Sequence, residues 1–222
     1  MEDIYVVAAA CSYQTHLYML FIVHSLSARP HSAVISARRC KIHTVRGIAH
    51  RDDDRSAITV RYDSSIRRKL WYRNGRKHRD GDQPAAVCFD DDRVYRVTHY
   101  RHGKKHRDND RPAQICTSGA GPHVAWWVDG YKGRQGDKPT FMGYNRMDWR
   151  RNSRKHRDHD KPAYIYLGAT TSVEWFTHGS QRRDNGPMTI YIDEFDGLPQ
   201  LVYSRASRRT TWGDRLSNLL HN

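Results

Sequence analysis

The chain has 222 residues, of which 37% are hydrophobic and 28% are charged. With 6 tryptophans and 13 tyrosines, this composition excludes an intrinsically disordered chain and indicates either one large domain or an array of repeats. Lysine and arginine total 38 against 24 acidic residues, a net charge of +14; it favours nucleic acid, an anionic membrane or an acidic protein as partner, unless it is a compositional bias.

The N-terminal segment is apolar. Residues 4–28 contain no lysine, arginine, aspartate or glutamate. The acidic start of the chain argues against a signal peptide, and Gln14, His16 and His24 argue against a membrane span. We expect residues 1–40 to form an apolar cap at one end of the fold, with a membrane anchor as the alternative.

From residue 41 onward, the chain repeats one pattern. The motif His-Arg-Asp, or its equivalent, returns at intervals of 28, 28, 27, 23 and 26 residues. Self-similarity at such a period is typical of a stacked repeat architecture. We therefore predict about six units over residues 41–197, then a degenerate capping unit and tail over residues 198–222. The anchor positions of the units are His50, His78, His106, Gly133, His156 and Arg182.

The segment before each anchor predicts a β-strand and a tight turn. Large residues stand nine and seven positions before the anchor, and residues two apart lie on one face of a strand. The turn that follows, such as Asn74-Gly75, has residues that tolerate the positive φ angles of a type I′ hairpin. The predicted core stripe consists of Trp71, Trp126, Trp149 and Trp175.

The segment after each anchor predicts an irregular bend and a second strand. Most anchors are followed six residues later by a proline, which cannot donate a ladder hydrogen bond and so marks the start of a strand or a bulge. A small alanine and a β-rich run come next. The predicted fold is therefore all-β, an elongated antiparallel sheet of stacked β-hairpin repeats with a short apolar N-terminal cap segment.

The polar residues of the bends are expected to form a ladder that joins each bend to its neighbour. A metal ladder of histidines is the alternative, but a spacing of one hairpin, about 9–10 Å, is too large for shared coordination. The paired aspartates resemble a calcium loop without its remaining ligands. The bend-defining residues are His50, Arg51, His78, Arg79, Asp80, His106, Arg107, Asp108, His156, Arg157 and Asp158.

No motif indicates catalysis. The triplet His-Arg-Asp also opens the catalytic loop of protein kinases, but the other kinase motifs are missing and the triplet recurs in four units. No nucleophile elbow, Walker loop or Rossmann fingerprint occurs. We expect no enzymatic activity, no cofactor and no metal.

Four cysteines occur, and no two of them form a C-x-x-C pair. Cys88 and Cys116 both stand ten residues past their anchors, so they occupy equivalent places on adjacent units. We expect ordinary sheet residues. A disulfide or metal pair is the alternative, with the Cα atoms near or beyond the disulfide limit.

A pair of basic residues follows several turns. We expect these residues to line one edge of the array, either as solvated charges that prevent aggregation between sheets or as a surface that binds a partner. The candidate basic edge consists of Arg76, Lys77, Lys104, Lys105, Arg154 and Lys155.

The unit WYRNGRKHRDGDQPA resembles the MORN-type repeat in a divergent form, W-Y-x-N-G-K-x-H-R-E-D-G-P-A, and is most similar to arrays from large DNA viruses and phages. The resemblance covers about residues 41–195. The sixth unit, with RRDNGPM, keeps the family spacing, whereas other units insert one residue before the proline. The resemblance implies an elongated hairpin stack that acts as a scaffold, a dimerisation module or an anchor near membranes, without a catalytic residue.

We therefore expect a non-enzymatic scaffold for protein–protein interaction, as a structural or virion-associated component of a large DNA virus. Its partner would be a capsid or other virion protein, and its location the virion or the host cytoplasm. The alternative is a peripheral module that binds anionic phospholipid or nucleic acid through the basic edge. Open sheet edges would also allow self-association.

Overall fold

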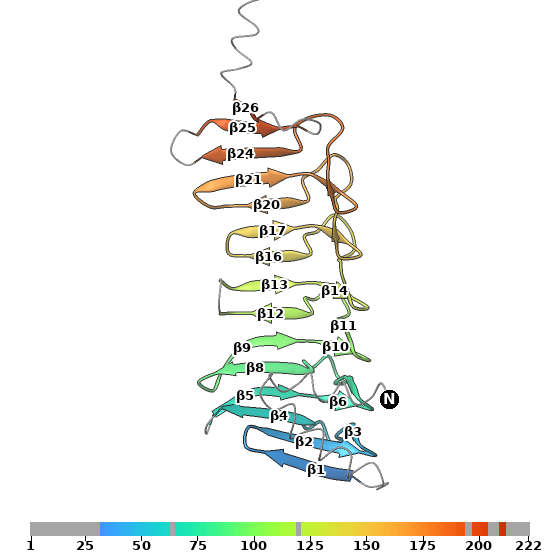
Figure 1. Ribbon diagram of the computed structural model, residues 1–222. Coiled ribbons are helices and arrows are strands. Elements are labelled where there is room, and N and C mark those ends of the chain that lie inside the picture. Colours follow the sequence, from blue (N-terminus) through green and yellow to red (C-terminus); the bar gives the residue numbers. More distant parts are fainter. Residues whose placement is uncertain (1–31, 63–64, 119–120, 194–196, 204–208, 212–222) are drawn as a thin grey trace, which may run out of the picture. The chain divides into compact units, whose positions relative to one another are not determined.

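The computed structural model describes residues 32–62, 65–118, 121–193, 197–203 and 209–211 (Figure 1). Every regular element among these residues is a β-strand, which confirms the predicted all-β fold. The chain divides into two compact units, residues 1–118 and 119–222. No helix of the length and apolarity needed to cross a membrane is present in the described part of the chain.

The first unit is an open antiparallel sheet of consecutive hairpins. Its strands follow the order β1-β2-β4-β5-β8-β9-β12, and the short β3 pairs with β2. Two small ribbons, β6-β7 and β10-β11, stand apart from the sheet. The strands are β1 (Ser32–Ala37), β2 (Cys40–Val45), β3 (Ile48–Ala49), β4 (Ile58–Tyr62), β5 (Ser65–Leu70), β6 (Tyr72–Arg73), β7 (Arg76–Lys77), β8 (Ala86–Asp90), β9 (Arg93–Thr98), β10 (Tyr100–Arg101), β11 (Lys104–Lys105) and β12 (Gln114–Cys116).

The second unit repeats this arrangement. Its sheet has the order β13-β16-β17-β20-β21-β24-β25-β26, and its ribbons are β14-β15, β18-β19 and β22-β23. Figure 1 shows the ribbons at one end of the sheet strands. The strands are β13 (His123–Ala125), β14 (Trp127–Val128), β15 (Tyr131–Lys132), β16 (Phe141–Gly143), β17 (Arg146–Asp148), β18 (Arg150–Arg151), β19 (Arg154–Lys155), β20 (Tyr164–Tyr166), β21 (Thr170–Glu174), β22 (Phe176–Thr177), β23 (Ser180–Gln181), β24 (Thr189–Asp193), β25 (Pro199–Val202) and β26 (Arg209–Thr211).

The predicted domain limits compare with these elements as follows. Residues 1–31, most of the predicted apolar cap or anchor, lie outside the described residues. The sheet already begins at Ser32, so the hairpin β1-β2 spans the predicted limit between residues 40 and 41. Of the predicted C-terminal capping unit, residues 199–202 and 209–211 belong to strands β25 and β26, and residues 212–222 are outside the description.

The two-residue turns are as predicted from the sequence. Asn74 and Gly75 have φ angles of 48° and 73°, and His102 and Gly103 have angles of 48° and 86°. Only residues that tolerate the left-handed region fit such a turn, and its twist matches that of the flanking strands. The same pair of positive φ angles occurs at Arg46-Gly47, Asp129-Gly130, Asn152-Ser153 and His178-Gly179.

The two faces of each sheet differ. In the first unit, Ile42, Ile58, Leu70 and Ala86 are cross-strand neighbours and all are buried. Side chains alternate along a strand, so the neighbouring positions point to the opposite face. On the corresponding face of its own sheet, the second unit carries one continuous aliphatic row. The aliphatic row, in order across the strands, is Val124, Met142, Met147, Ile165, Val173, Ile190 and Leu201.

Candidate functional site: the bends and the sheet faces

Each bend is joined to the preceding strand by the same two backbone hydrogen bonds. The N–H of His78 donates to the carbonyl of Trp71 at 3.2 Å, and the N–H of Trp71 donates to the carbonyl of Ala85 at 2.9 Å. These bonds turn the chain away from the sheet into the ribbon. Equivalent pairs occur at the anchors His50, His106, Gly133, His156 and Arg182.

After four of the anchors, the next residue is an arginine that binds the aspartate of the preceding bend. Arg79 donates from Nε to Oδ1 of Asp54 at 2.6 Å and from Nη2 to Oδ2 at 2.8 Å. Its Nη1 also donates to the carbonyl of Pro84 in its own bend at 3.4 Å. Two parallel charge-assisted bonds fix both partners in one geometry. The same bidentate contact joins Arg107 to Asp82, Arg157 to Asp137 and Arg183 to Asp160.

These contacts change the acidity of the aspartates. In each case the hydrogen bond from arginine is the largest cause and lowers the pKa of the carboxyl below its usual value, because it stabilises the charged form. The affected residues are Asp54, Asp82, Asp137 and Asp160.

Four of the arginines that follow an anchor also lie over the tryptophans of the predicted core stripe. The Cζ atoms are 3.8 to 4.1 Å from the indole centroids, a cation–π geometry. Trp126, Trp149 and Trp175 are buried, whereas Trp71 is half-buried. Each indole therefore packs against the arginine of its bend. The stacked pairs are Arg79 on Trp71, Arg134 on Trp126, Arg157 on Trp149 and Arg183 on Trp175.

The expectation that positions nine and seven before the anchor share a face is wrong. The sheet strand β5 ends at Leu70, and Trp71 belongs to no strand. The chain changes direction at this point, so the alternation of the strand ends. Consecutive residues can then both be buried, as Leu70 and the equivalents of Trp71 are. The residues nine before the anchor, such as Met147 and Val173, lie on the opposite face, in the aliphatic row.

The anchor histidines join each bend to the next ribbon. Nδ1 of His78 accepts a hydrogen bond from the backbone N–H of His102 at 3.3 Å, and Nε2 pairs with Oδ1 of Asp80 at 2.8 Å. Since a backbone N–H can only donate, Nδ1 is the acceptor in this contact, which leaves Nε2 to donate to Asp80. The rings of His78 and His102 are also stacked, with centroids 4.6 Å apart. His156 and His178 repeat both contacts.

The paired aspartates therefore have separate structural roles. Asp80 accepts from His78 and Arg73 of its own repeat, whereas Asp82 accepts from Arg107 of the next repeat. The carboxylates of one bend thus belong to different contacts. Among the described residues, no group of three or more histidine, cysteine, aspartate or glutamate side chains is placed to hold a metal ion.

The candidate basic edge divides into two rows. Arg76, Lys104 and Arg154, which directly follow their turns, are exposed. The second residue of each pair is half-buried, because side chains alternate along the ribbon strand. The structure thus places three of the six predicted residues on the outer edge, and the others, Lys77, Lys105 and Lys155, on the packed side.

The inward lysines pack on aromatic rings. Nζ of Lys155 lies 3.8 Å from the ring centroid of Tyr164 and 4.3 Å from that of Phe176. Burial lowers the pKa of Lys77, Lys105 and Lys155, since desolvation disfavours the charged form. These lysines are less available for a phosphate partner than the sequence suggested.

A buried polar cluster in the second unit was not foreseen. Asp148 is 1% exposed and accepts hydrogen bonds from Thr140 Oγ1 at 2.9 Å and Arg150 Nε at 3.1 Å. Nζ of Lys132 lies 3.3 Å from its Oδ2, and burial lowers the pKa of Lys132 to about 8. The signal in the sequence is an aspartate eight residues before its anchor, at the position that Leu70 holds in the second repeat.

Within the described residues, neither Cys88 nor Cys116 is part of a disulfide. Cys88 and Cys116 are cross-strand neighbours of the same residue, Arg96, on either side of it. They therefore lie two strand spacings apart, about 9–10 Å, which is too far for a disulfide. Cys11 is outside the description.

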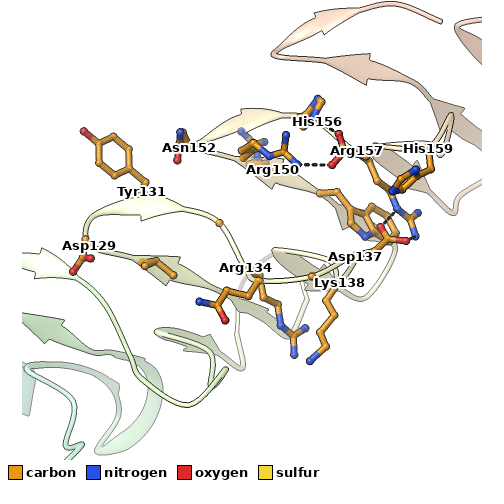
Figure 2. Close-up of a pocket in the computed structure, with 17 residues that line it drawn as sticks. Asp129, Tyr131, Arg134, Asp137, Lys138, Arg150, Asn152, His156, Arg157 and His159 are labelled. Atoms are coloured by element: carbon orange, nitrogen blue, oxygen red, sulfur yellow. Dashed lines mark hydrogen bonds and ion pairs between the residues drawn. The ribbon is translucent and has the colours of Figure 1, made fainter.

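A pocket of about 760 Å³ lies between the ribbons of the fourth and fifth repeats. Figure 2 shows Asp129 and Tyr131 on one ribbon and Arg150 and Asn152 on the other. Arginines, aspartates and a buried tryptophan line it together. Gly133, the anchor of the fourth repeat, is among the lining residues, so the pocket coincides with the repeat that departs most from the pattern.

Comparison with known proteins adds no assignment: no protein-family model matches the sequence, and a search of curated proteins finds no significant relative.

Proposed function

We propose that this chain is a non-enzymatic, MORN-like repeat scaffold that binds another protein. The observation that carries the proposal is the aliphatic row of the second unit. None of its seven residues is buried, and Met142 is 41% exposed. A contiguous apolar strip on a protein surface is typical of an interaction site, and a row that crosses seven strands suits a protein surface better than a small ligand.

The chemistry of the bends supports a non-enzymatic role. Their histidines, arginines and aspartates are used in contacts within and between repeats, as in the pair of His78 with Asp80 in one bend and the pair of Arg79 with Asp54 between two bends. Groups held in this way stabilise the array, and the lowered pKa values of the aspartates follow from structural ion pairs. The similarity of the repeat to viral arrays supports a place for this scaffold in a virus particle.

The experiment that tests this proposal is site-specific photo-cross-linking in the native source. A photoreactive phenylalanine analogue at Met142 is expected to capture one defined protein. The same analogue at Val94, which is 50% exposed and lies outside the aliphatic row, is the matched control. Failure of Met142 to capture a protein, or equal capture from Val94, would contradict the proposal.

One observation favours the alternative, binding of anionic phospholipid or nucleic acid. Arg76 and Lys104 in the first unit and Arg154 in the second stand exposed at equivalent places of their ribbons. Binding by such exposed charges weakens steeply as salt rises. Adducts of lipid or nucleic acid from a photoreactive residue at Arg154, together with none of protein from Met142, would establish this alternative.

A further inference from the structure

The fourth repeat lacks three polar side chains that its neighbours share. In the second, third and fifth repeats, an arginine five residues before the anchor and the anchor histidine both bind the aspartate two residues after the anchor. In the fifth repeat these are Arg151, His156 and Asp158. In the fourth repeat the same positions hold Val128, Gly133 and Gln135. All three line the pocket of about 760 Å³, so the pocket occupies the space of the missing group.

The backbone around this space is the same as at complete junctions. The N–H of Ser153 donates to the carbonyl of Lys132 at 2.9 Å. This bond joins the ribbons of the fourth and fifth repeats. The corresponding bonds run from Gly75 to Ala49 at 2.9 Å, from Gly103 to Lys77 at 2.9 Å and from Gly179 to Lys155 at 2.8 Å. The junction therefore keeps its geometry and lacks only the side chains.

The missing histidine leaves a hydrogen-bond donor at a defined place. At complete junctions the first turn residue donates its N–H to the histidine Nδ1, as Asn74 does to His50 at 3.0 Å. Asn152 is the equivalent turn residue, with a φ of 49° against 48° for Asn74. Within the described residues, the N–H of Asn152 has no acceptor. A ligand that filled the space could supply one.

Glycine is not required at position 133 by the backbone. Its φ is outside the left-handed region, and an added Cβ would meet only the carbonyl oxygen of Arg150, at 3.9 Å. A larger side chain would therefore fit. The role of the glycine is to leave this space open, because it has no side chain.

A second group in the pocket also lacks its usual contact. Trp71 and Trp175 donate from Nε1 to the carbonyls of Asp54 and Asp160 at 3.1 and 3.0 Å. Trp149 lines the pocket, is 7% exposed, and its Nε1 has no acceptor among the described residues. Two donors between the fourth and fifth repeats, the N–H of Asn152 and Nε1 of Trp149, thus lack the acceptors that their equivalents have elsewhere. This is expected if a ligand supplies acceptors at this place.

We propose that this pocket binds a planar nitrogen heterocycle, with its ring in the place of the missing imidazole and a ring nitrogen accepting from the N–H of Asn152. The stacked rings of His78 and His102, with planes 9° apart, show that the equivalent place at a complete junction takes a flat ring. The pocket has the size of a small-molecule site, so it also has room for polar substituents beside Arg134 and Arg151. A ring with an unprotonated nitrogen fits best, because the group that faces it is a donor.

The test is a titration of ¹⁵N-labelled full-length protein with imidazole at about pH 8, where the free ring is mostly neutral. Saturable shifts of the Gly133 and Asn152 amide signals are expected at millimolar concentrations. Pyrrole, a ring of the same size without an acceptor nitrogen, is the matched control and should bind at least tenfold more weakly. No saturable shift, or equal binding of pyrrole, would overturn the proposal.

Two variants add independent readouts. In Gly133→His the new side chain fills the space, so imidazole should no longer shift the Asn152 amide; an undiminished response would count against the proposal. In His78→Gly a second empty junction is created, and imidazole should now shift the amide of His102. If neither variant folds, the comparison of imidazole with pyrrole on the natural chain still decides.

The heterocycle could be a small molecule or a histidine side chain of a partner. A Gly-His-Gly peptide distinguishes these sources in the same titration. Binding of the peptide as tightly as imidazole assigns the site to a histidine side chain, whereas binding of imidazole alone assigns it to a small molecule. Binding of neither contradicts the proposal.

Discussion

Arg107 binds both carboxylate oxygens of Asp82, a residue 25 positions earlier in the chain, through Nε and Nη2 at 2.9 Å each. Arg111 reaches the same carboxylate through one Nη1 contact at 2.8 Å. The side chain of Arg107 is 17% exposed and that of Arg111 is 45% exposed. One aspartate thus takes a bidentate, mostly buried contact and a single exposed contact from the same neighbouring repeat.

This pair permits a matched test of the contact between repeats. Arg107→Lys keeps the charge but loses the planar two-point contact and the bond to Pro112, so it should lower the free energy of unfolding by about 1–2 kcal/mol. Arg111→Lys should cost less than about 0.5 kcal/mol, as is usual for an exposed ion pair. Urea denaturation measures both. Equal losses would show that geometry is unimportant here.

The aspartates bound by arginine make the fold sensitive to strong acid. The arginine hydrogen bond lowers the pKa of Asp82 below its reference value of 3.8. Its stabilising contribution is therefore complete above about pH 4 and is lost as the pH falls through the lower folded value. The unfolding free energy should decline steeply in that range. Asp82→Asn should show a smaller decline than the natural chain, and parallel curves would refute this account.

A second pH dependence is expected nearer neutrality. His99 takes the place of the tryptophan in its repeat and is 5% exposed. Burial, and then the charge of Arg107, lower the pKa of this ring below 6.5. The unfolded chain therefore binds a proton first, and stability falls as the pH drops below about 6.5. His99→Trp introduces the residue of the second, fourth, fifth and sixth repeats and should remove this part of the dependence, which thermal melts across the range would reveal.

Alkaline conditions should stabilise the fold, whereas acid destabilises it. Burial lowers the pKa of Lys132 to about 8, from a reference value of 10.5. Between these values the unfolded chain binds more protons than the folded one, so the unfolding free energy rises with pH. Lys132→Met should flatten the rise between about pH 8 and 10. Lys104→Met, at an exposed position of a ribbon, is the control and should leave the curve unchanged.

The thiols provide a test of the strand order. Cys88 and Cys116 flank Arg96 on two different strands, so mild oxidation should not join them. Cys116 is 1% exposed and should react with a thiol reagent more slowly than Cys88 in the folded protein. Peptide mapping by mass spectrometry checks both statements. An intramolecular bond between Cys88 and Cys116 would be incompatible with the observed register.

The sequence predicted the features that depend on local conformation. Pairs such as Asn74 and Gly75 identify the turns, since few residues accept positive φ. It did not predict the corner at Trp71, because that corner depends on a hydrogen bond to Ala85, fourteen residues later. The burial of Lys77 was missed for a related reason: a ribbon of only two residues per strand offers no periodic pattern to indicate its inner side.

The candidate sites were predicted less well than the fold. The aliphatic row escaped notice because its members, such as Met147 and Ile165, come from separate strands and meet only through the register of the sheet. The pocket depends on an absence, a glycine where four other repeats have histidine. A single sequence shows that Gly133 departs from the pattern, but only the structure shows that no other described residue has filled the space.

The contact between Asp82 and Arg107 joins a bend only to the bend directly after it. Excision of residues 78–105 would bring His106 and Arg107 opposite the bend that carries Asp54, which presents the same carboxylate as Asp82. Because each repeat supplies an even number of sheet strands, the remaining strands would still alternate in direction. Genes for such arrays can therefore grow or shrink by whole repeats through unequal recombination, and each new length would be ready to fold.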